Sequence, residues 1–346
     1  MLISPVSEHL SGAMGNPNVM MTASLASSKI QSQIQSFLHY VYQHTGIEVT
    51  RVDVLPASPH KGYIITSADG NYFVLKTSPS SNTRLLRCEA SSPAGEASIL
   101  QRLSGPMLLN FPVPRLLSAS NSSSSPLSGP YLLRSYVAGI PLSSISHRLT
   151  TYDREQIDKT VGAHLRHAVN NTSSQFGTIA RIDKGDGYGS WREAFHALFE
   201  AVLRDAEDAV LTLPYQSIRH YVGLHMHHLD AVTEPRLVPL RAGTPETVLL
   251  DENRKCVVGI LSWGDVLWGD PSLGEVFTGA TSSFWLGFGG QQILQYGDGY
   301  DERRSQIYTV YRSIVSIVRQ NFRPRLGADE SEHRRILNWA LNQLAV

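Results

Sequence analysis

Two neighbouring segments in the C-terminal half of this 346-residue chain decide the fold. The first, residues 229–251, reads LDAVTEPRLVPLRAGTPETVLLD, and the second, residues 256–271, reads CVVGILSWGDVLWGDP. The second begins with the apolar run 256–261, which predicts a short strand. The stretch 235–245, inside the first segment, contains neither Asp nor Glu.

Together these segments resemble the aminoglycoside phosphotransferase family, a kinase-like group that includes choline and fructosamine kinases. The resemblance is strongest to a fungal-type branch with the pattern L-D-x-V-T-x-P-R-L-V-H-x-D-x-x-x-x-N-V-x-x-D, followed by G-I-I-D-[WF]-x-x-x-x-W-G-D-P. In that family the first Asp orients or deprotonates the attacking hydroxyl, and the Asn and the second Asp hold magnesium. The resemblance implies an α+β, protein-kinase-like fold with a small mixed β lobe and a larger helical lobe.

All three catalytic positions lack the group that the family uses. Counting from the two ends of the first segment gives results that differ by one residue, which predicts a one-residue insertion in the loop. The family positions fall on Pro239 for the His, Arg241 or Ala242 for the catalytic Asp, Thr247 for the Asn and Ser262 for the second Asp. Neither count gives a carboxylate.

These substitutions predict a protein without ordinary kinase activity. Magnesium prefers carboxylate oxygen, and a Ser or Thr hydroxyl is a poorer ligand. A general base contributes about 10²- to 10⁴-fold to a rate, and kinases turn over at about 1–100 s⁻¹. Loss of the base alone therefore predicts a rate near or below about 0.1 s⁻¹. We expect no catalytic residue, no bound metal and no cofactor.

Upstream motifs extend the resemblance to about residues 35–325. The strand 72–76 ends in Lys76, which in the family contacts the nucleotide phosphates, and the helix 94–103 carries Glu96 at the position of its partner. The segment 131–142 predicts a strand that runs into the hinge between the lobes. The predicted pocket therefore comprises Lys76, Glu96, Arg134, Ser135, Tyr136, Val137, Arg241, Ser262 and Asp265. The loop 54–62, which would cradle phosphate, has two prolines and one glycine and is poorly suited to that task.

The remaining pattern predicts the organisation of the chain. Residues 1–28 form a flexible tail, 29–137 a β-rich lobe and 138–346 a helical lobe. Within the β-rich lobe we expect a helix over 30–42, a hairpin turn at 68–71 and a polar surface loop over 118–129. In the helical lobe the expected helices are 153–170, 190–211, 215–230, 272–285, 301–321 and 329–344. The 301–321 helix has core residues at three- and four-residue spacing, namely Ile307, Val310, Ile314, Ile317 and Val318.

Composition excludes several classes of function. Lys plus Arg and Asp plus Glu each number 30, so no basic excess favours nucleic acid or anionic lipid. No apolar run reaches the roughly 20 residues of a membrane span, and the N-terminus does not resemble a secretory signal. We therefore expect a cytoplasmic protein that binds neither nucleic acid nor membrane. Two cysteines do not form a disulfide framework, and Cys256 is predicted to be a small buried residue.

A histidine cluster and three acidic residues have competing interpretations. His225, His227 and His228 form a local cluster, but no supporting Cys or Glu lies at a useful interval, so a solvated helix face is favoured over a metal site. Asp270 is expected to cap a turn rather than to act on a ligand. Asp265 and Glu246 are the carboxylates that could replace the missing metal ligand and the missing base.

The functional prediction is a pseudoenzyme that binds a small molecule or a protein partner and acts as an accessory protein in small-molecule metabolism. Arg241 reverses the charge of the catalytic position and so favours an anionic ligand such as a phosphate or a carboxylate. Two alternatives stay open. One is an ATP- and Mg²⁺-dependent small-molecule kinase with displaced catalytic residues, and the other is a cleft that catalyses a different reaction.

Overall fold

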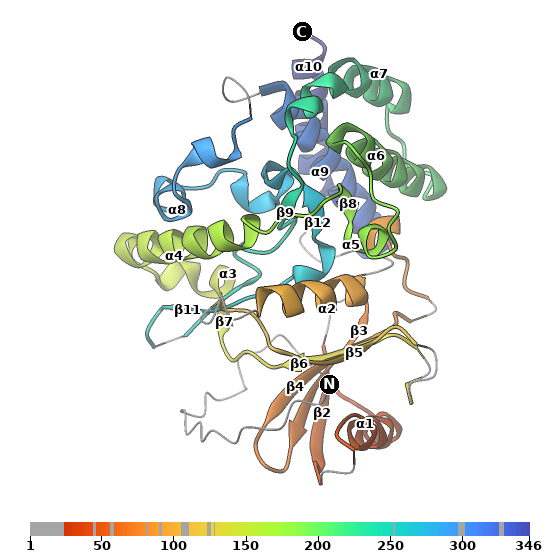
Figure 1. Ribbon diagram of the computed structural model, residues 1–346, viewed down its shortest axis with the longest axis vertical. Helices are drawn as coiled ribbons and strands as arrows, with labels where there is room; N and C mark the ends of the chain where they lie inside the picture. Colours follow the sequence, from red (N-terminus) through yellow and green to blue (C-terminus); the bar gives the residue numbers. More distant parts are fainter. Residues whose placement is uncertain are drawn as a thin grey trace.

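The computed structural model describes residues 24–43, 46–55, 59–80, 82–89, 92–104, 111–122, 126–127, 129–251, 253–296, 302–324 and 329–346. Residues 1–23 of the predicted tail, which spans 1–28, lie outside the described residues. Figure 1 shows a sheet-based lobe at the bottom and a mainly helical lobe at the top, as an α+β chain requires. Within the described ranges, no helix is long and apolar enough to cross a membrane.

The small lobe is built on a six-stranded antiparallel sheet with the order β1-β2-β3-β4-β6-β5. Helix α1 (Ser28–Val41) packs on this sheet through Ile34, Phe37 and Leu38, which confirms the predicted first helix. The hairpin turn predicted at 68–71 is also confirmed, and Gly70 adopts the positive φ that such a turn requires. The strands are β1 (Ser24–Leu25), β2 (Val49–Leu55), β3 (Lys61–Ser67), β4 (Tyr72–Thr77), β5 (Leu116–Ser120) and β6 (Tyr131–Ser135).

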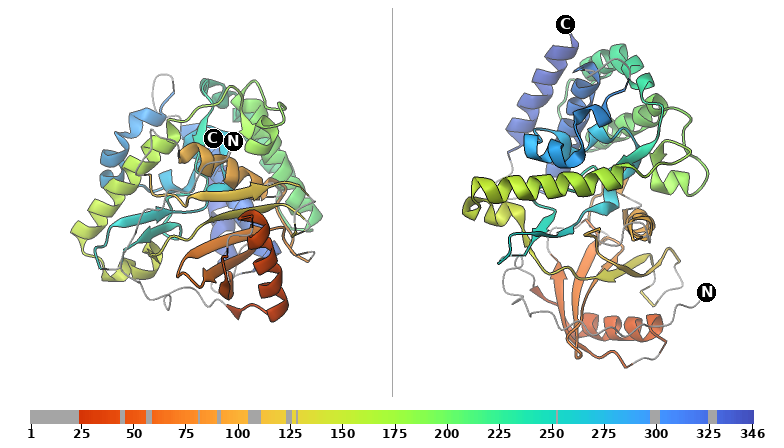
Figure 2. Two further views of the ribbon diagram at one scale, coloured as in Figure 1. Left: turned by 60° about the horizontal axis from the view of Figure 1, so that its bottom comes forward. Right: turned by 60° about the vertical axis from the view of Figure 1, so that its left-hand side comes forward.

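Helix α2 (Ser92–Leu103) lies between the two lobes, where Figures 1 and 2 show it above the sheet. Its residues Ile99, Leu100 and Leu103 are fully buried, as their spacing predicts. They belong to a core that consists mainly of residues from the helical lobe. Helix α2 is thus fixed to both lobes: Glu96 pairs with Lys76 of the sheet, and Ile99, Leu100 and Leu103 pack in the core of the helical lobe.

The large lobe contains a long helix, α4, that runs beside the interlobe region, with the other helices stacked beyond it (Figure 2). Two small sheets, ordered β11-β10-β7 and β8-β12-β9, place the two fold-deciding segments next to α2. The helices are α3 (Leu142–Ile145), α4 (Thr151–Val169), α5 (Ile179–Ile182), α6 (Trp191–Asp208), α7 (Tyr215–His225), α8 (Ser282–Phe288), α9 (Glu302–Phe322) and α10 (Glu330–Leu344). The strands are β7 (Ile140–Pro141), β8 (Gly177–Thr178), β9 (Arg236–Val238), β10 (Val248–Leu250), β11 (Val257–Ile260) and β12 (Leu267–Gly269).

Short 3₁₀ turns complete the structure and connect several of these elements. They are η2 (Arg87–Glu89), η4 (Ser146–Arg148), η5 (Met226–Ala231), η6 (Trp263–Asp265), η7 (Pro271–Leu273), η8 (Glu275–Phe277) and η9 (Gln291–Leu294). Helix α9 is the centre of the large-lobe core, and its five predicted core residues are all fully buried. The periodicity of that helix is therefore confirmed.

Three local predictions are wrong. The helix predicted over 272–285 is replaced by the turns η7 and η8 and the short helix α8, which begins after its cap Thr281; Gly274 and Gly279 interrupt the helical pattern. Cys256 is exposed because it precedes the edge strand β11 at the end of a hairpin. The polar stretch that begins at Ser118 is partly a strand, since β5 pairs with β6 as far as Ser120.

Candidate functional site

The loop between β9 and β10 holds Arg241, Ala242 and Thr247, and a single hydroxyl closes it. Thr247 Oγ1 accepts a hydrogen bond of 3.0 Å from the backbone N–H of Gly243. The same hydroxyl lies 3.0 Å from the carbonyl of Thr244 and 3.1 Å from that of Arg241, so its one proton is donated within the loop. Thr247 is buried. Thr247, which the sequence resemblance aligns with a metal-binding Asn, therefore holds its own loop together.

The two candidates for the catalytic Asp position have different surroundings. Ala242 is fully buried, and its methyl group packs within the core that α2 and α4 share. Arg241 is partly exposed and lines a cavity in the helical lobe. Of the two, only Arg241 is therefore placed to meet a ligand.

Ser262, which the sequence resemblance aligns with the second metal ligand, has an unusual backbone conformation. Its φ of 67° and ψ of 44° lie in the left-handed region, which Asp and Asn occupy several-fold more often than other non-glycine residues. Ser262 directly precedes η6, whose Trp263 and Asp265 follow it into the interlobe region. The backbone here has a shape that suits Asp, but the side chain it carries is a hydroxyl.

The Lys76–Glu96 pair predicted from strand β4 and helix α2 forms, and a third residue joins it. Lys76 Nζ donates to Glu96 Oε2, while Arg134 Nε lies 3.4 Å from Glu96 Oε1. Burial alone would raise the pKa of Glu96, but the charges of Lys76 and Arg134 outweigh it and hold this pKa below its usual value. Two cations thus share one buried carboxylate and fix α2 against the sheet.

The hinge segment is already engaged in hydrogen bonds. The backbone N–H of Ser135 donates to Arg115 O at 2.8 Å, and the backbone N–H of Tyr136 donates to Tyr72 O at 3.2 Å. Arg134 turns inward to Glu96 and also donates to the carbonyl of Ser135 at 3.4 Å. These two N–H groups and this carbonyl, which could otherwise recognise a nucleobase, therefore have partners within the chain. Residues 56–58 of the predicted phosphate loop lie outside the described part of the chain.

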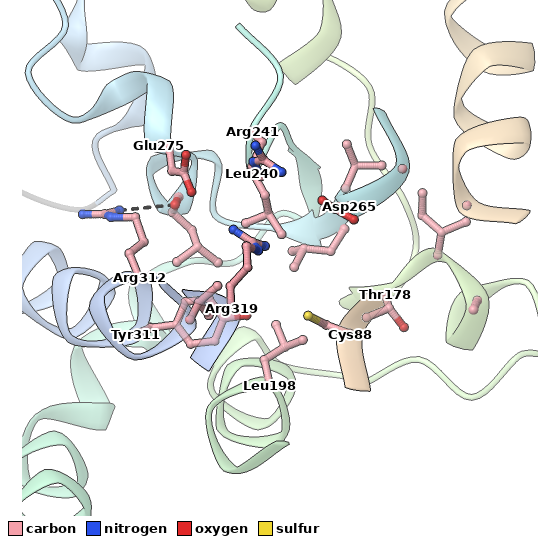
Figure 3. Close-up of a pocket in the computed structure, with 18 residues that line it drawn as sticks. Cys88, Thr178, Leu198, Leu240, Arg241, Asp265, Glu275, Tyr311, Arg312 and Arg319 are labelled. Carbon is pink, nitrogen blue, oxygen red and sulfur yellow. Dashed lines mark hydrogen bonds between the residues drawn. The ribbon is translucent and has the colours of Figure 1, made fainter. Parts of the chain in front are cut away.

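The cavity that Arg241 lines reaches Gly95, near the start of α2, and is enclosed by α6, η6 and α9 (Figure 3). About 40 Å³ of it is open to the centres of water molecules, which at roughly 10–15 Å³ per water leaves space for a few waters or one small ligand group. Its wall is mainly apolar. The charged residues that line it are Arg241, Asp265, Glu275, Arg312 and Arg319.

Arg319 occupies the middle of this charged group. In Figure 3 its guanidinium lies between Asp265 and Glu275, which stand on opposite sides of the cavity. Burial would lower the pKa of Arg319, but the carboxylates of Asp265, Glu89 and Glu275 reverse that effect and raise it. Arg319 Nε also lies 3.3 Å from Glu89 Oε1. The two carboxylates of the cavity are therefore held beside a buried cation.

The structure separates the predicted site residues into two groups. Arg241 and Asp265 line the cavity, whereas Lys76, Glu96 and the hinge form the other group at the sheet. Glu246 is exposed and lies outside the cavity. Asp270 caps η7 by accepting from the N–H of Ser272 at 2.9 Å, as predicted.

The three histidines at the junction of α7 and η5 lie within 6.5 Å of one another, measured between ring centroids. His225 Nε2 lies 2.8 Å from the carbonyl of Leu344. No group of three His, Cys, Asp or Glu side chains within the described ranges is arranged to hold a metal ion. Of the three, His225 contributes to the contact of α7 with α10, and His227 is exposed.

Sequence reasoning missed the contribution of α9 to the cavity. Arg312 and Arg319 lie seven residues apart on this helix, with Tyr311 and Val315 on the same face. Their i, i+7 spacing was a usable signal, because two cations on an otherwise core-facing side of a helix need a polar destination. Glu275 was missed because η8 was predicted as part of a longer helix.

The arrangement of elements matches solved kinase-like structures. Over 91% of this chain and 97% of the other, it is similar to a putative aminoglycoside phosphotransferase from Ralstonia eutropha JMP134, with a TM-score of 0.59 and 11% sequence identity. The GDP complex of aminoglycoside 2'-phosphotransferase-IIIa matches 90% of this chain and 99% of that one, with a TM-score of 0.53 at 17% identity. A putative fructosamine-3-kinase from Thermobifida fusca matches 88% and 97%, with a TM-score of 0.55 at 16% identity.

The predicted two-lobed, aminoglycoside-phosphotransferase-like fold is thus confirmed over about nine-tenths of the chain. Comparison at the level of sequence finds no matching family model and no matching curated protein.

Proposed function

We propose that this chain is a pseudoenzyme of the aminoglycoside phosphotransferase type: a kinase-like protein that does not transfer phosphate and instead binds a small molecule between its helices. The observation that carries the proposal is the state of the loop between β9 and β10. A side chain that closes its own loop, a buried methyl group and an arginine lie in this loop, at positions that the sequence resemblance assigns to the metal ligand and the base.

Electrostatics at the cavity supports the same conclusion. Metal ions that bridge the phosphates must offset charge on the moving phosphoryl group. Arg241 brings a positive charge to the place where the catalytic carboxylate would be needed. The guanidinium of Arg319 lies close to Asp265, the carboxylate that could replace the missing metal ligand. A divalent cation would be repelled by both guanidinium groups. The retained Lys76–Glu96–Arg134 network then has a structural role in joining α2 to the sheet.

The competing function is a working small-molecule kinase, and one observation favours it. Asp265 and Glu275 both line the cavity, so carboxylate oxygens are present near the interlobe region. A magnesium ion held by them would have to displace Arg319 from between them. Glu246, the other candidate base, is exposed and does not line the cavity, which weakens this alternative.

Thermal unfolding with nucleotide tests the proposal. A ligand at a hundred times its Kd stabilises a protein by about 2.7 kcal/mol, so retained Mg²⁺-ATP binding would raise the Tm by several degrees. We expect no Mg²⁺-dependent rise with ATP or GTP for the full chain, and no nucleotide-dependent release of phosphate. An active aminoglycoside phosphotransferase in the same assay provides the positive control.

A turnover signal would require one further comparison, because a contaminating phosphatase gives the same readout. The Lys76→Met variant removes the side chain that would contact the phosphates. Turnover by the full chain that disappears in Lys76→Met, together with a Mg²⁺-dependent rise in Tm, would overturn the proposal and establish the kinase.

A further inference from the structure

We infer that the cavity between η6, α6 and α9 is a binding site for the carboxylate of a small, largely apolar organic acid, with Arg241 as its recognition residue. This inference rests on the proposed function, because Arg241 replaces the catalytic carboxylate in the same loop. It adds the chemical class of the ligand and the residues of α9 that complete the site.

The charged groups around the cavity carry a net positive charge. Three guanidinium groups, those of Arg241, Arg312 and Arg319, face two carboxylates, those of Asp265 and Glu275. These five groups together carry one excess positive charge. The adjoining pair of Arg323 and Glu89 adds no net charge, since Arg323 Nη2 contacts both oxygens of Glu89 at 2.7 and 2.8 Å. One monoanion would neutralise the site. A dianion such as phosphate would leave an uncompensated negative charge.

Of the three guanidinium groups, that of Arg241 is the one that a ligand would meet. Arg319 is held by Glu89 and influenced by Asp265, and Arg312 donates to the carbonyls of Leu273 at 3.2 Å and Ser272 at 3.4 Å. Among the described residues, the guanidinium of Arg241 makes no hydrogen bond or ion pair. An arginine has five N–H donors in a planar fork that matches a carboxylate. Arg241 is therefore the group that a ligand would satisfy.

The wall and the size of the cavity limit the rest of the ligand. Leu198, Leu240, Val266, Leu267 and Val315 supply most of the wall, so a chain or ring attached to the carboxylate would be taken out of water at about 25 cal/mol per Å² of apolar surface. The space open to water centres is about 40 Å³, which suits a short acid and excludes a sugar or a nucleotide. A small aliphatic carboxylate thus satisfies charge, shape and polarity together.

Butanoate is the probe that tests this inference, with butanamide as its neutral match and inorganic phosphate as the competing anion. Binding to the ¹⁵N-labelled full chain is followed by NMR through the arginine Nε–H signals, and the Arg241 signal is assigned by its loss in Arg241→Gln. We expect butanoate to shift that signal with a Kd in the millimolar range. Butanamide should leave it unchanged, and phosphate should bind at least tenfold more weakly.

Two substitutions have opposite expected effects, which separates a specific site from general damage. A hydrogen bond to a charged group is worth about 1.5–3 kcal/mol, so Arg241→Gln should weaken butanoate binding by about 10- to 100-fold. Because this variant lacks the Arg241 signal, its binding is followed through the signal of Arg319, which also lines the cavity. Glu275→Gln removes a like charge, keeps the backbone hydrogen bond from residue 275 to Leu240 O, and should tighten binding about 3- to 10-fold. Equal binding of butanamide, tighter binding of phosphate, or a Glu275→Gln variant that binds more weakly would each overturn the inference.

The two proposals fail in different ways. If butanoate does not bind and Mg²⁺-ATP is also ignored, the carboxylate site is refuted while the pseudoenzyme proposal stands. If Mg²⁺-ATP turnover is found, the proposed function is refuted whatever butanoate does.

Discussion

The hydroxyl of Tyr308, on α9, donates a hydrogen bond of 2.8 Å to Asp270 Oδ2, and both side chains are buried. The same hydroxyl accepts a hydrogen bond of 2.7 Å from Trp191 Nε1 on α6. Arg304 Nε, also on α9, lies 3.0 Å from the same oxygen, Asp270 Oδ2. Asp270 thus joins the end of β12 to α9 directly and to α6 through Tyr308. The Trp-Gly-Asp-Pro motif is therefore a structural joint that keeps the wall of the cavity in place without supplying a reacting group.

Removal of that hydroxyl should destabilise the large lobe. In Tyr308→Phe the indole N–H of Trp191 loses its acceptor and Asp270 loses a donor, and an unsatisfied buried polar group costs about 1–3 kcal/mol. Urea denaturation should show a loss of this size. Tyr152→Phe, at an exposed tyrosine on α4, is the matched control and should be neutral. Equal midpoints for the two variants would show that the joint contributes nothing.

Two glycines set the close contact of α4 with α8. A Cβ on Gly162 would collide with the carbonyl oxygen of Phe284, and one on Gly287 would collide with the carbonyl oxygen of Lys159. Backbone atoms cannot rotate away, so either Gly→Ala substitution must push the helices apart. We expect each variant to lose about 1–3 kcal/mol in urea denaturation, as other overpacked cores do.

Gly223, on α7, provides the control for this pair because nothing lies within 4 Å of its added Cβ. Gly223→Ala should stabilise the protein by about 0.5–1 kcal/mol through helix propensity alone. A stabilised Gly162→Ala or Gly287→Ala variant would mean that the α4–α8 contact is loose.

Sequence patterns predicted most of the framework because they depend on local periodicity and on motifs of fixed spacing. The α9 core and the Lys76–Glu96 pair, twenty residues apart, are of this kind. The hydrogen bonds of Thr247 within its loop could not be predicted, since a hydroxyl gives no sign of which carbonyl it will meet. Nor could the meeting of Arg241 with α9, because periodicity indicates which face of a helix is buried but not what that face covers. The predicted burial of Cys256 was wrong because an apolar run does not show which strand lies at the edge of a sheet.

The two cysteines should differ in reactivity. Cys88 lines the cavity, where burial and then the charges of Asp265 and Glu89 raise the pKa of its thiol to about 12. At pH 8 only about one Cys88 side chain in 10,000 is then a thiolate, which is the reactive form. Cys256 is exposed. Native alkylation with iodoacetamide should add one label, at Cys256, and none to Cys256→Ser, as intact mass spectrometry would show. Labelling of Cys88 at a similar rate would contradict the burial of the cavity.

The cap of α4 should make stability depend on acid pH in a defined direction. Lys255 Nζ donates to Asp153 Oδ2 at 2.6 Å, and the backbone N–H of Thr150 donates to the same oxygen at 3.0 Å. These hydrogen bonds, that of Lys255 first, lower the pKa of Asp153 to about 2, below the roughly 3.9 of an unfolded chain. Because the folded pKa is the lower one, the contribution of Asp153 to stability is complete above about pH 4 and is lost as pH falls towards 2.

Replacing Lys255 should remove most of that dependence. In Lys255→Gln the pKa of Asp153, measured from its carboxyl ¹³C shift, should rise towards 3.9 while the bond from Thr150 keeps it slightly lower. The urea midpoint of the variant should then fall less steeply than that of the unchanged chain between pH 4 and 2. Lys159→Gln, at an exposed lysine of the same helix, should leave both quantities unaltered. An Asp153 pKa that stays near 2 in Lys255→Gln would show that the helix cap alone, and not the contact with the hairpin of β10 and β11, holds this carboxylate ionised.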